Sequence, residues 1–137
     1  MKNIFVDSDV ILDVLIPKID YVVDSAIVLD MINKKKDLGF TSSVIILNVY
    51  YIIKKSYNRE EAINIIKKTM NLLKILNVSD VELRNAFNST FPDIEDAVQY
   101  QVAINNKIDY IITRNKKDYT NSIIPIYTPT EYINQSL

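Results

Sequence analysis

The stretch KNIFVDSD, at residues 2–9, decides the fold, because a short apolar run ends there in two carboxylates. The run 4–6 predicts a buried strand, and Asp7 and Asp9 follow at its carboxyl end. Expected strands and helices alternate along the rest of the chain, a pattern typical of a parallel sheet covered on both faces. We therefore expect one domain over residues 1–137, a three-layer α/β/α sandwich with a central, mainly parallel sheet of about five strands.

The boundaries of the elements follow from hydrophobic periodicity and from helix start signals. Asn58 with Glu61 and Ser79 with Glu82 have the capping-box spacing, and the segment 128–131 predicts the start of a last short helix. The expected strands are residues 2–6, 39–41, 74–78, 109–113 and 123–127. The other expected helices are residues 9–16, 21–36, 44–55, 58–73, 79–87 and 92–105.

The composition excludes several classes of function. A formal net charge of −1 offers no overall attraction to nucleic acid. The absence of histidine and cysteine excludes a histidine-assisted nucleophile, a thiolate enzyme and a zinc site built from those residues. The single glycine, Gly39, excludes P-loop and dinucleotide-binding fingerprints. We expect neither a membrane span nor a signal peptide, and the lack of cysteine fits a cytoplasmic protein.

Oxygen-bearing side chains gather where the expected strands end. Asp7 follows the first strand, Asp93 and Asp96 open a helix, and Asn115 and Asp118 follow the fourth strand. Because ligands of open α/β sheets bind at the carboxyl ends of the strands, we expect these side chains to meet. Carboxylate and amide oxygens are the ligands of hard divalent cations, so the pattern predicts a site for Mg²⁺ or Mn²⁺.

Each acid also has a local structural explanation. Asp9 stands nearer to the expected helix 9–16 and fits the N-cap role better than Asp7 does. Asp93 belongs to the first turn of its helix, where the dipole favours negative charge, whereas Asp96 directly precedes the apolar Ala97. We therefore favour Asp7 and Asp96 as metal ligands, with Asp93 as a neighbour and Asp9 as either cap or ligand.

The loop after the fourth strand reads TRNKKDY, at residues 113–119. Taken alone it is an ordinary polar loop, but it is expected to leave the sheet at the same edge as Asp7. There the hydroxyl of Thr113 is able to orient a phosphate or a metal-bound water, and Arg114 is able to contact phosphate.

The ordered set of motifs resembles that of the PIN-domain family, metal-dependent ribonucleases that include the toxins of toxin–antitoxin pairs. The resemblance covers nearly the whole chain and rests on FVDSDV at 5–10, DIEDA at 93–97, ITRN at 112–115 with the Asp118–Tyr119 pair, and YTPTEY at 127–132. It implies a catalytic set of Asp7, Asp96, Asn115 and Asp118, and a Mg²⁺ or Mn²⁺ ion held by Asp7, Asp96, Asp93 and Asn115.

The same resemblance implies an endoribonuclease that cuts single-stranded RNA, is held off by an antitoxin protein and forms a homodimer. One position departs from the family pattern. Where relatives usually carry an acid in the helix after the second strand, this chain has Asn48, which offers an amide oxygen without charge. Asn115 is also neutral where many relatives have aspartate, so metal binding and activity are expected to be weaker.

Two alternatives remain open from the sequence. Asp7 and Asp9 also match the opening of haloacid-dehalogenase-type phosphatases, with Asp7 as the nucleophile, although the glycine-rich turns of those enzymes are missing here. The second alternative is a catalytically silent module of the PIN fold that binds RNA or protein, and Asn48 is its main support. Trapping of an aspartyl-phosphate and metal-stimulated RNA cleavage distinguish the three.

Overall fold

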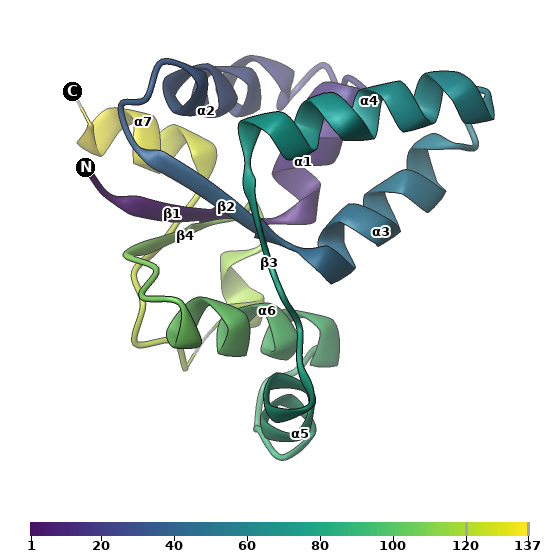
Figure 1. Cartoon of the computed structure of the whole chain (residues 1–137). Helices are drawn as coiled ribbons and strands as arrows, with labels where there is room; N and C mark the ends of the chain where they lie inside the picture. The colour runs from purple at the N-terminus through teal and green to yellow at the C-terminus, as the bar shows by residue number, and fades with distance from the viewer. Residues whose placement is uncertain (120, 137) are drawn as a thin grey trace.

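A five-stranded sheet lies at the centre of the computed structural model, which describes residues 1–119 and 121–136 (Figure 1). Every pairing in it is parallel, as expected, and the strand order is β3-β2-β1-β4-β5. The strands are β1 (Asn3–Val6), β2 (Leu38–Ser42), β3 (Lys74–Leu76), β4 (Tyr110–Ile112) and β5 (Ile126–Tyr127). The last strand begins later than expected because the segment before it contains Pro125, which has no N–H to donate to a ladder.

Helices cover both faces of the sheet and complete the three layers (Figure 1). One face carries α1 (Ser8–Leu15), α2 (Val22–Asn33), α4 (Arg59–Leu72) and α7 (Pro129–Gln135), with α3 (Ser43–Ile53) packed against α1 and α4. The other face carries α6 (Ile94–Asn105), and α5 (Asp80–Phe87) packs against α6 on its outer side. A 3₁₀ helix, η1 (Lys116–Tyr119), was not expected from the sequence and contacts α6.

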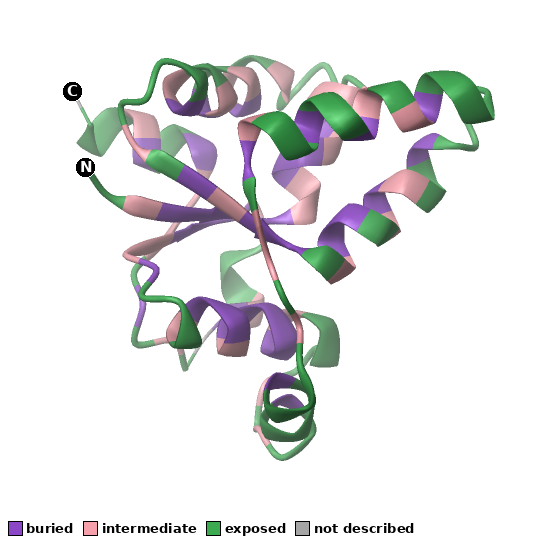
Figure 2. Ribbon diagram, in the orientation of Figure 1, coloured by how far each residue is buried: buried purple, intermediate pink, exposed green. Residues whose placement is uncertain are grey.

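The core lies between the sheet and the inner faces of the helices, as the buried colouring in Figure 2 shows. Ile4, Phe5 and Val6 of the central strand are all fully buried, and the burial of a side chain such as Phe5 contributes roughly 2–3 kcal/mol. On β2, a Cβ at Gly39 would lie 2.7 Å from both Ile32 and Leu73, so this glycine permits close packing rather than a turn.

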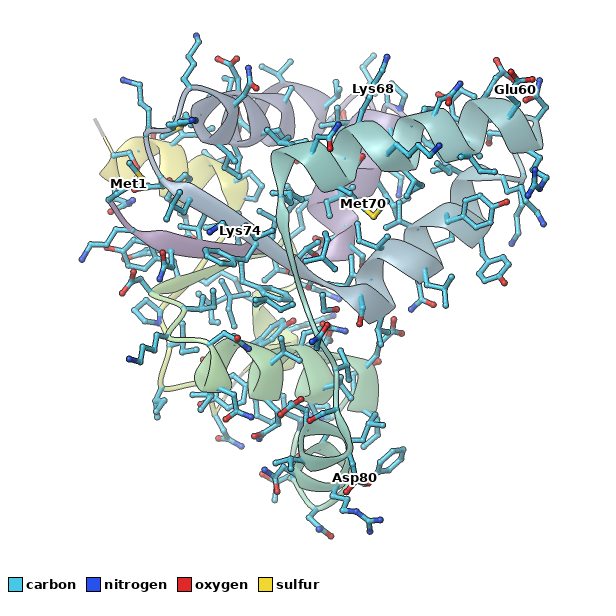
Figure 3. All side chains as sticks on the ribbon, in the orientation of Figure 1. Met1, Glu60, Lys68, Met70, Lys74 and Asp80 are labelled. Atoms are coloured by element: carbon cyan, nitrogen blue, oxygen red, sulfur yellow. The ribbon has the colours of Figure 1, made fainter. Side chains whose placement is uncertain are left out.

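Local signals set the helix starts as the sequence predicts. Asn58 and Glu61 form a reciprocal capping box at 2.9 and 3.1 Å, and the backbone N–H and hydroxyl of Ser79 both donate to Glu82. A cap of this kind is worth about 1 kcal/mol. Charged side chains such as the labelled Glu60 stand outward from α4, which leaves its apolar face for the core (Figure 3).

The strand order places a topological switch point between β1 and β4. The chain builds β1, β2 and β3 outward in one direction and then returns to add β4 on the opposite side of β1. Ladder hydrogen bonds continue past both strand ends, because the Asp7 N–H donates to the Ile112 carbonyl at 3.0 Å and the Thr113 N–H donates to Tyr127 at 2.9 Å. Ligands of open α/β sheets bind in the crevice at such a point.

Candidate metal centre

A pocket of about 160 Å³ opens where β1 and β4 end. Five of the residues expected at the site line it together: Asp7 after β1, Asp93 and Asp96 at the start of α6, and Asn115 and Asp118 in the segment after β4. The rest of the lining comes from Ser8, Ile45, Glu95 and Gln99. Residues far apart in the sequence thus bring their oxygens to one hollow at the switch point.

Asp7, in the lining of this pocket, is fixed by three hydrogen bonds. Its Oδ1 accepts a hydrogen bond from the Ser8 N–H at 2.8 Å, and its Oδ2 accepts from the hydroxyls of Thr113 at 2.9 Å and Tyr119 at 3.2 Å. The residue is only 6% exposed. Burial, together with repulsion from Asp9, raises the pKa of Asp7 to about 6 despite these hydrogen bonds.

The N-cap of α1 is Asp7, so the expectation that Asp9 fits this role better is wrong. Asp9 lies inside the first turn of α1, and its Oδ2 accepts from the Arg114 N–H at 3.0 Å while the Thr113 hydroxyl lies 3.3 Å away. Burial raises the pKa of the Asp9 carboxyl. The Asp9 side chain therefore links α1 to the residues that follow β4, and it does not line the pocket.

Arg114 is tied into the scaffold rather than turned toward the pocket. Its guanidinium donates to both carboxylate oxygens of Asp13, at 2.8 and 3.1 Å, and lies 3.9 Å from the ring centroid of Tyr21. Asp13 is fully buried and also accepts from the Ser25 hydroxyl at 3.0 Å. A bidentate pair of this kind holds the segment after β4 in place, so the phosphate contact proposed for Arg114 finds no support in the geometry.

Thr113 likewise acts on the carboxylates. Its fully buried hydroxyl donates to Asp7 and accepts from the Asn115 N–H at 3.1 Å, which links the two neighbouring strand ends. Burial raises the pKa of the Tyr119 phenol well above its ordinary value, so this side chain stays protonated and donates to Asp7. Two hydroxyls therefore orient Asp7, where the sequence suggested a direct role for Thr113 at phosphate or metal-bound water.

Asp96 is the most strongly perturbed carboxyl of the pocket. Partial burial raises its pKa to about 8, with repulsion from Asp7, Asp93 and Asp118 as further causes. Asp93 is the N-cap of α6 and accepts from the Asp96 N–H at 3.0 Å, so its local cap role and its place in the pocket coexist. Burial and the neighbouring carboxylates together therefore disfavour the ionised form of Asp96.

The donor set fits a hard divalent cation, since it consists of carboxylate, amide and hydroxyl oxygens and contains neither sulfur nor imidazole. Within residues 1–119 and 121–136, no group of three or more acidic side chains is already arranged to coordinate one ion. The acids instead share a pocket in which one of them is driven toward its protonated form. A bound cation would compensate the same repulsion, which is the electrostatic reason that the pocket suits it.

Asn48 lies outside the pocket lining. Its amide donates to Glu95 Oε1 at 2.5 Å, so position 48 reaches the pocket only through Glu95. Among the lining residues, the sequence predicted a role at the site for neither Glu95 nor Gln99. A signal for Gln99 exists in the sequence, because it follows Asp96 by three residues and so shares its face on a helix.

A family model and a curated relative both match most of this chain. The family model for the PIN domain matches residues 3–117. Ribonuclease VapC1 of Aquifex aeolicus (strain VF5) is 28% identical over an alignment of 128 residues that covers 89% of this chain and 88% of that protein. Among the described residues, no helix is both long and apolar enough to cross a membrane.

Solved structures share the fold at low sequence identity. A toxin–antitoxin complex from Klebsiella pneumoniae superposes with a TM-score of 0.69 at 17% identity, covering 91% of this chain and 96% of the other. VapC20 of Mycobacterium tuberculosis, described as a sarcin–ricin loop cleaving toxin, superposes with a TM-score of 0.63 at 12% identity, covering 79% and 86%. These likenesses establish the fold.

Proposed function

This chain belongs to the PIN-domain family, and from that premise we propose that it is a metal-dependent endoribonuclease that cuts single-stranded RNA. The observation that carries the proposal is the pocket at the β1–β4 switch point, where Asp7, Asp96, Asn115 and Asp118 meet. The similarity to a VapC ribonuclease supports RNA as the substrate class. The family match leaves the phosphatase alternative without support.

Asp7, Asp96, Asp93 and Asn115 would hold the cation, Mg²⁺ or Mn²⁺, with Asp118 beside them. When bound, it would lower the pKa of a water and stabilise charge on the scissile phosphate. The protein's own contribution is to position these oxygens. Thr113 and Tyr119 fix one Asp7 oxygen, and the N–H of Ser8 fixes the other.

An antitoxin partner belongs to the same proposal. The structural relative from Klebsiella pneumoniae is a toxin–antitoxin complex, and this chain offers an apolar groove of about 290 Å³ between α1, α2 and α4. Its lining includes Val14 and Leu15 of α1, Leu29 of α2, and Leu72 of α4. We assign this groove to an apolar segment of the antitoxin.

We also include a homodimer in the proposal. Leu47 and Tyr51 are each 55% exposed on α3, one helical turn apart, and Leu83 and Phe87 are likewise exposed one turn apart on α5. Exposed apolar side chains at such spacing are typical of surfaces that a second chain covers. The location in the cytoplasm that the sequence indicates stays a prediction.

The test is cleavage of 5′-labelled single-stranded RNA by purified protein, with and without Mn²⁺. Wild type should cut only with the cation, and Asp7→Asn should lose the activity while it remains folded. Asp30→Asn is the matched control: it makes the same chemical change at an exposed position of α2, where the Asp30 side chain pairs with Lys34 and with no other described residue. It should cut like wild type.

Two results would contradict the proposal. Cleavage by Asp7→Asn at the wild-type rate would remove Asp7 from the reaction. A folded wild type that binds RNA without cutting it at any Mn²⁺ concentration would instead favour the silent binding module suggested by Asn48.

A further inference from the structure

Gln99 is a buried polar side chain without an evident structural role. It lies in α6, is 1% exposed, and neither its amide oxygen nor its amide nitrogen has a hydrogen-bond partner among the described residues. Buried amides are almost always paired, because desolvation of both polar groups is costly when nothing replaces the lost water. An apolar residue at this position would serve packing better, so the amide requires another explanation.

The position of Gln99 in the structure supplies an explanation for its unpartnered amide. The side chain lines the same pocket as Asp7, Asp96, Asn115 and Asp118. It follows Asp96 by three residues in α6, so both project from the same face of the helix. The unpartnered amide therefore belongs to a residue of the pocket wall that also carries the acidic side chains.

The chemistry of an amide differs from that of the acids around it. Ionised carboxylates only accept hydrogen bonds and suit direct contact with a cation, whereas an amide both accepts and donates and carries no charge. Mg²⁺ usually keeps several of its waters, whose protons point outward and need acceptors. A neutral amide oxygen in the pocket wall meets that need, and the amide nitrogen is able to donate to a carboxylate.

We propose that Gln99 is a positioning residue of the cation site: in the cation-bound protein its amide oxygen accepts from a water of the hydrated cation, and its amide nitrogen, unpartnered among the described residues, donates to a pocket carboxylate. The proposal rests on the proposed function, because it assumes that the pocket binds a divalent cation. It assigns a role to a residue that neither coordinates the ion directly nor fills the apolar core.

Gln99→Met tests the assignment, because methionine keeps the length of an unbranched side chain and removes both polar groups. Gln101→Met, on the same helix and outside the pocket lining, is the matched control. Calorimetric titration with Mn²⁺ and metal-free thermal melts are measured for wild type and both variants. Gln99→Met should bind Mn²⁺ about 10–100-fold more weakly, as is usual when a partner outside the ligand set is lost. Its metal-free melting temperature should equal or exceed that of wild type.

The outcomes separate the inference from the proposed function. If wild type binds Mn²⁺ and Gln99→Met binds it as tightly as Gln101→Met does, the role of Gln99 is refuted and the proposed function stands. If wild type binds no Mn²⁺, both are refuted.

Gln99→Glu decides the question if the methionine variant does not fold. The glutamate keeps an acceptor in place and adds negative charge, so Mn²⁺ binding should tighten several-fold while metal-free stability falls. An unchanged Mn²⁺ affinity in Gln99→Glu would overturn the assignment.

Discussion

Replacement of Asp7 by asparagine should stabilise the metal-free protein at high pH and not at low pH. The pKa of Asp7 lies at about 6 in the folded protein, above the ordinary value of 3.8, chiefly because the side chain is buried. An acid with a raised folded-state pKa makes its full contribution to stability when both states are protonated, and that contribution falls as pH rises through about 4 to 6. Asparagine has no charge to desolvate, so the stability of the variant does not fall in this pH range for this reason.

The magnitude follows from the same interval. The difference between 3.8 and about 6, at about 1.4 kcal/mol per pH unit, is worth roughly 3 kcal/mol at pH 8. Asparagine offers one acceptor oxygen where the carboxylate accepts from Ser8, Thr113 and Tyr119, and the disturbed hydrogen bonds cost about 1 kcal/mol at every pH. The variant should therefore be about 0.5 kcal/mol less stable than wild type near pH 4, where the unfolded-state carboxyl is already partly ionised, and about 2 kcal/mol more stable at pH 8.

Urea unfolding of metal-free wild type and Asp7→Asn, at pH 4 and at pH 8 in the presence of a chelator, measures this change. The decisive quantity is the difference between the two proteins' free energies of unfolding, and its shift between the two pH values. A difference that does not move with pH, or that moves against the variant as pH rises, would refute the argument from burial. A variant that is unfolded at both pH values would show instead that the carboxylate is needed for the fold.

Three further expectations concern the other residues of the site. Asp96→Asn should abolish Mn²⁺-dependent RNA cleavage, whereas Asp93→Asn should lower cleavage less. Asp93→Asn should also cost a few tenths to about 1 kcal/mol in urea unfolding, because asparagine still caps α6 and loses only the interaction with the helix dipole. The reverse order of activities would contradict the ligand assignment. Because the pKa of Asp96 is about 8, Mn²⁺ binding should release protons, and the Mn²⁺ affinity should rise as pH rises from 6 to 9. Calorimetric titration in two buffers of different ionisation enthalpy measures both effects. An affinity that does not change with pH would exclude Asp96 from coordination. Asn48→Asp places a carboxylate against Glu95 and should lower metal-free stability while it tightens Mn²⁺ binding; lower stability with unchanged affinity would remove position 48 from the site.

Local chemistry determined much of the fold in advance. The apolar run 4–6 is a strand because its side chains are buried on both faces of a parallel sheet, and the capping pairs at Asn58 and Ser79 start helices because the helix's own N–H groups need acceptors. The acids Asp7 and Asp96 could also be singled out, since strand ends in a parallel sheet share one edge. These are inferences from residues near one another in the sequence, or from a rule that applies to every such sheet.

The packing of distant segments decided what each polar side chain does. Arg114 pairs with Asp13 rather than reaching toward the pocket, because the end of β4 lies against α1 and buries that carboxylate beside it. The Asp9 carboxylate accepts a hydrogen bond from the backbone N–H of Arg114, and Asp7 rather than Asp9 is the N-cap of α1. Gln99 lines the same pocket as Asp7 and Asp96 because the packing of α6 against the sheet turns that side of the helix toward the pocket. A hydrogen-bonding group contacts whatever partner the tertiary structure brings within about 3 Å, and residue order along the chain does not specify that partner.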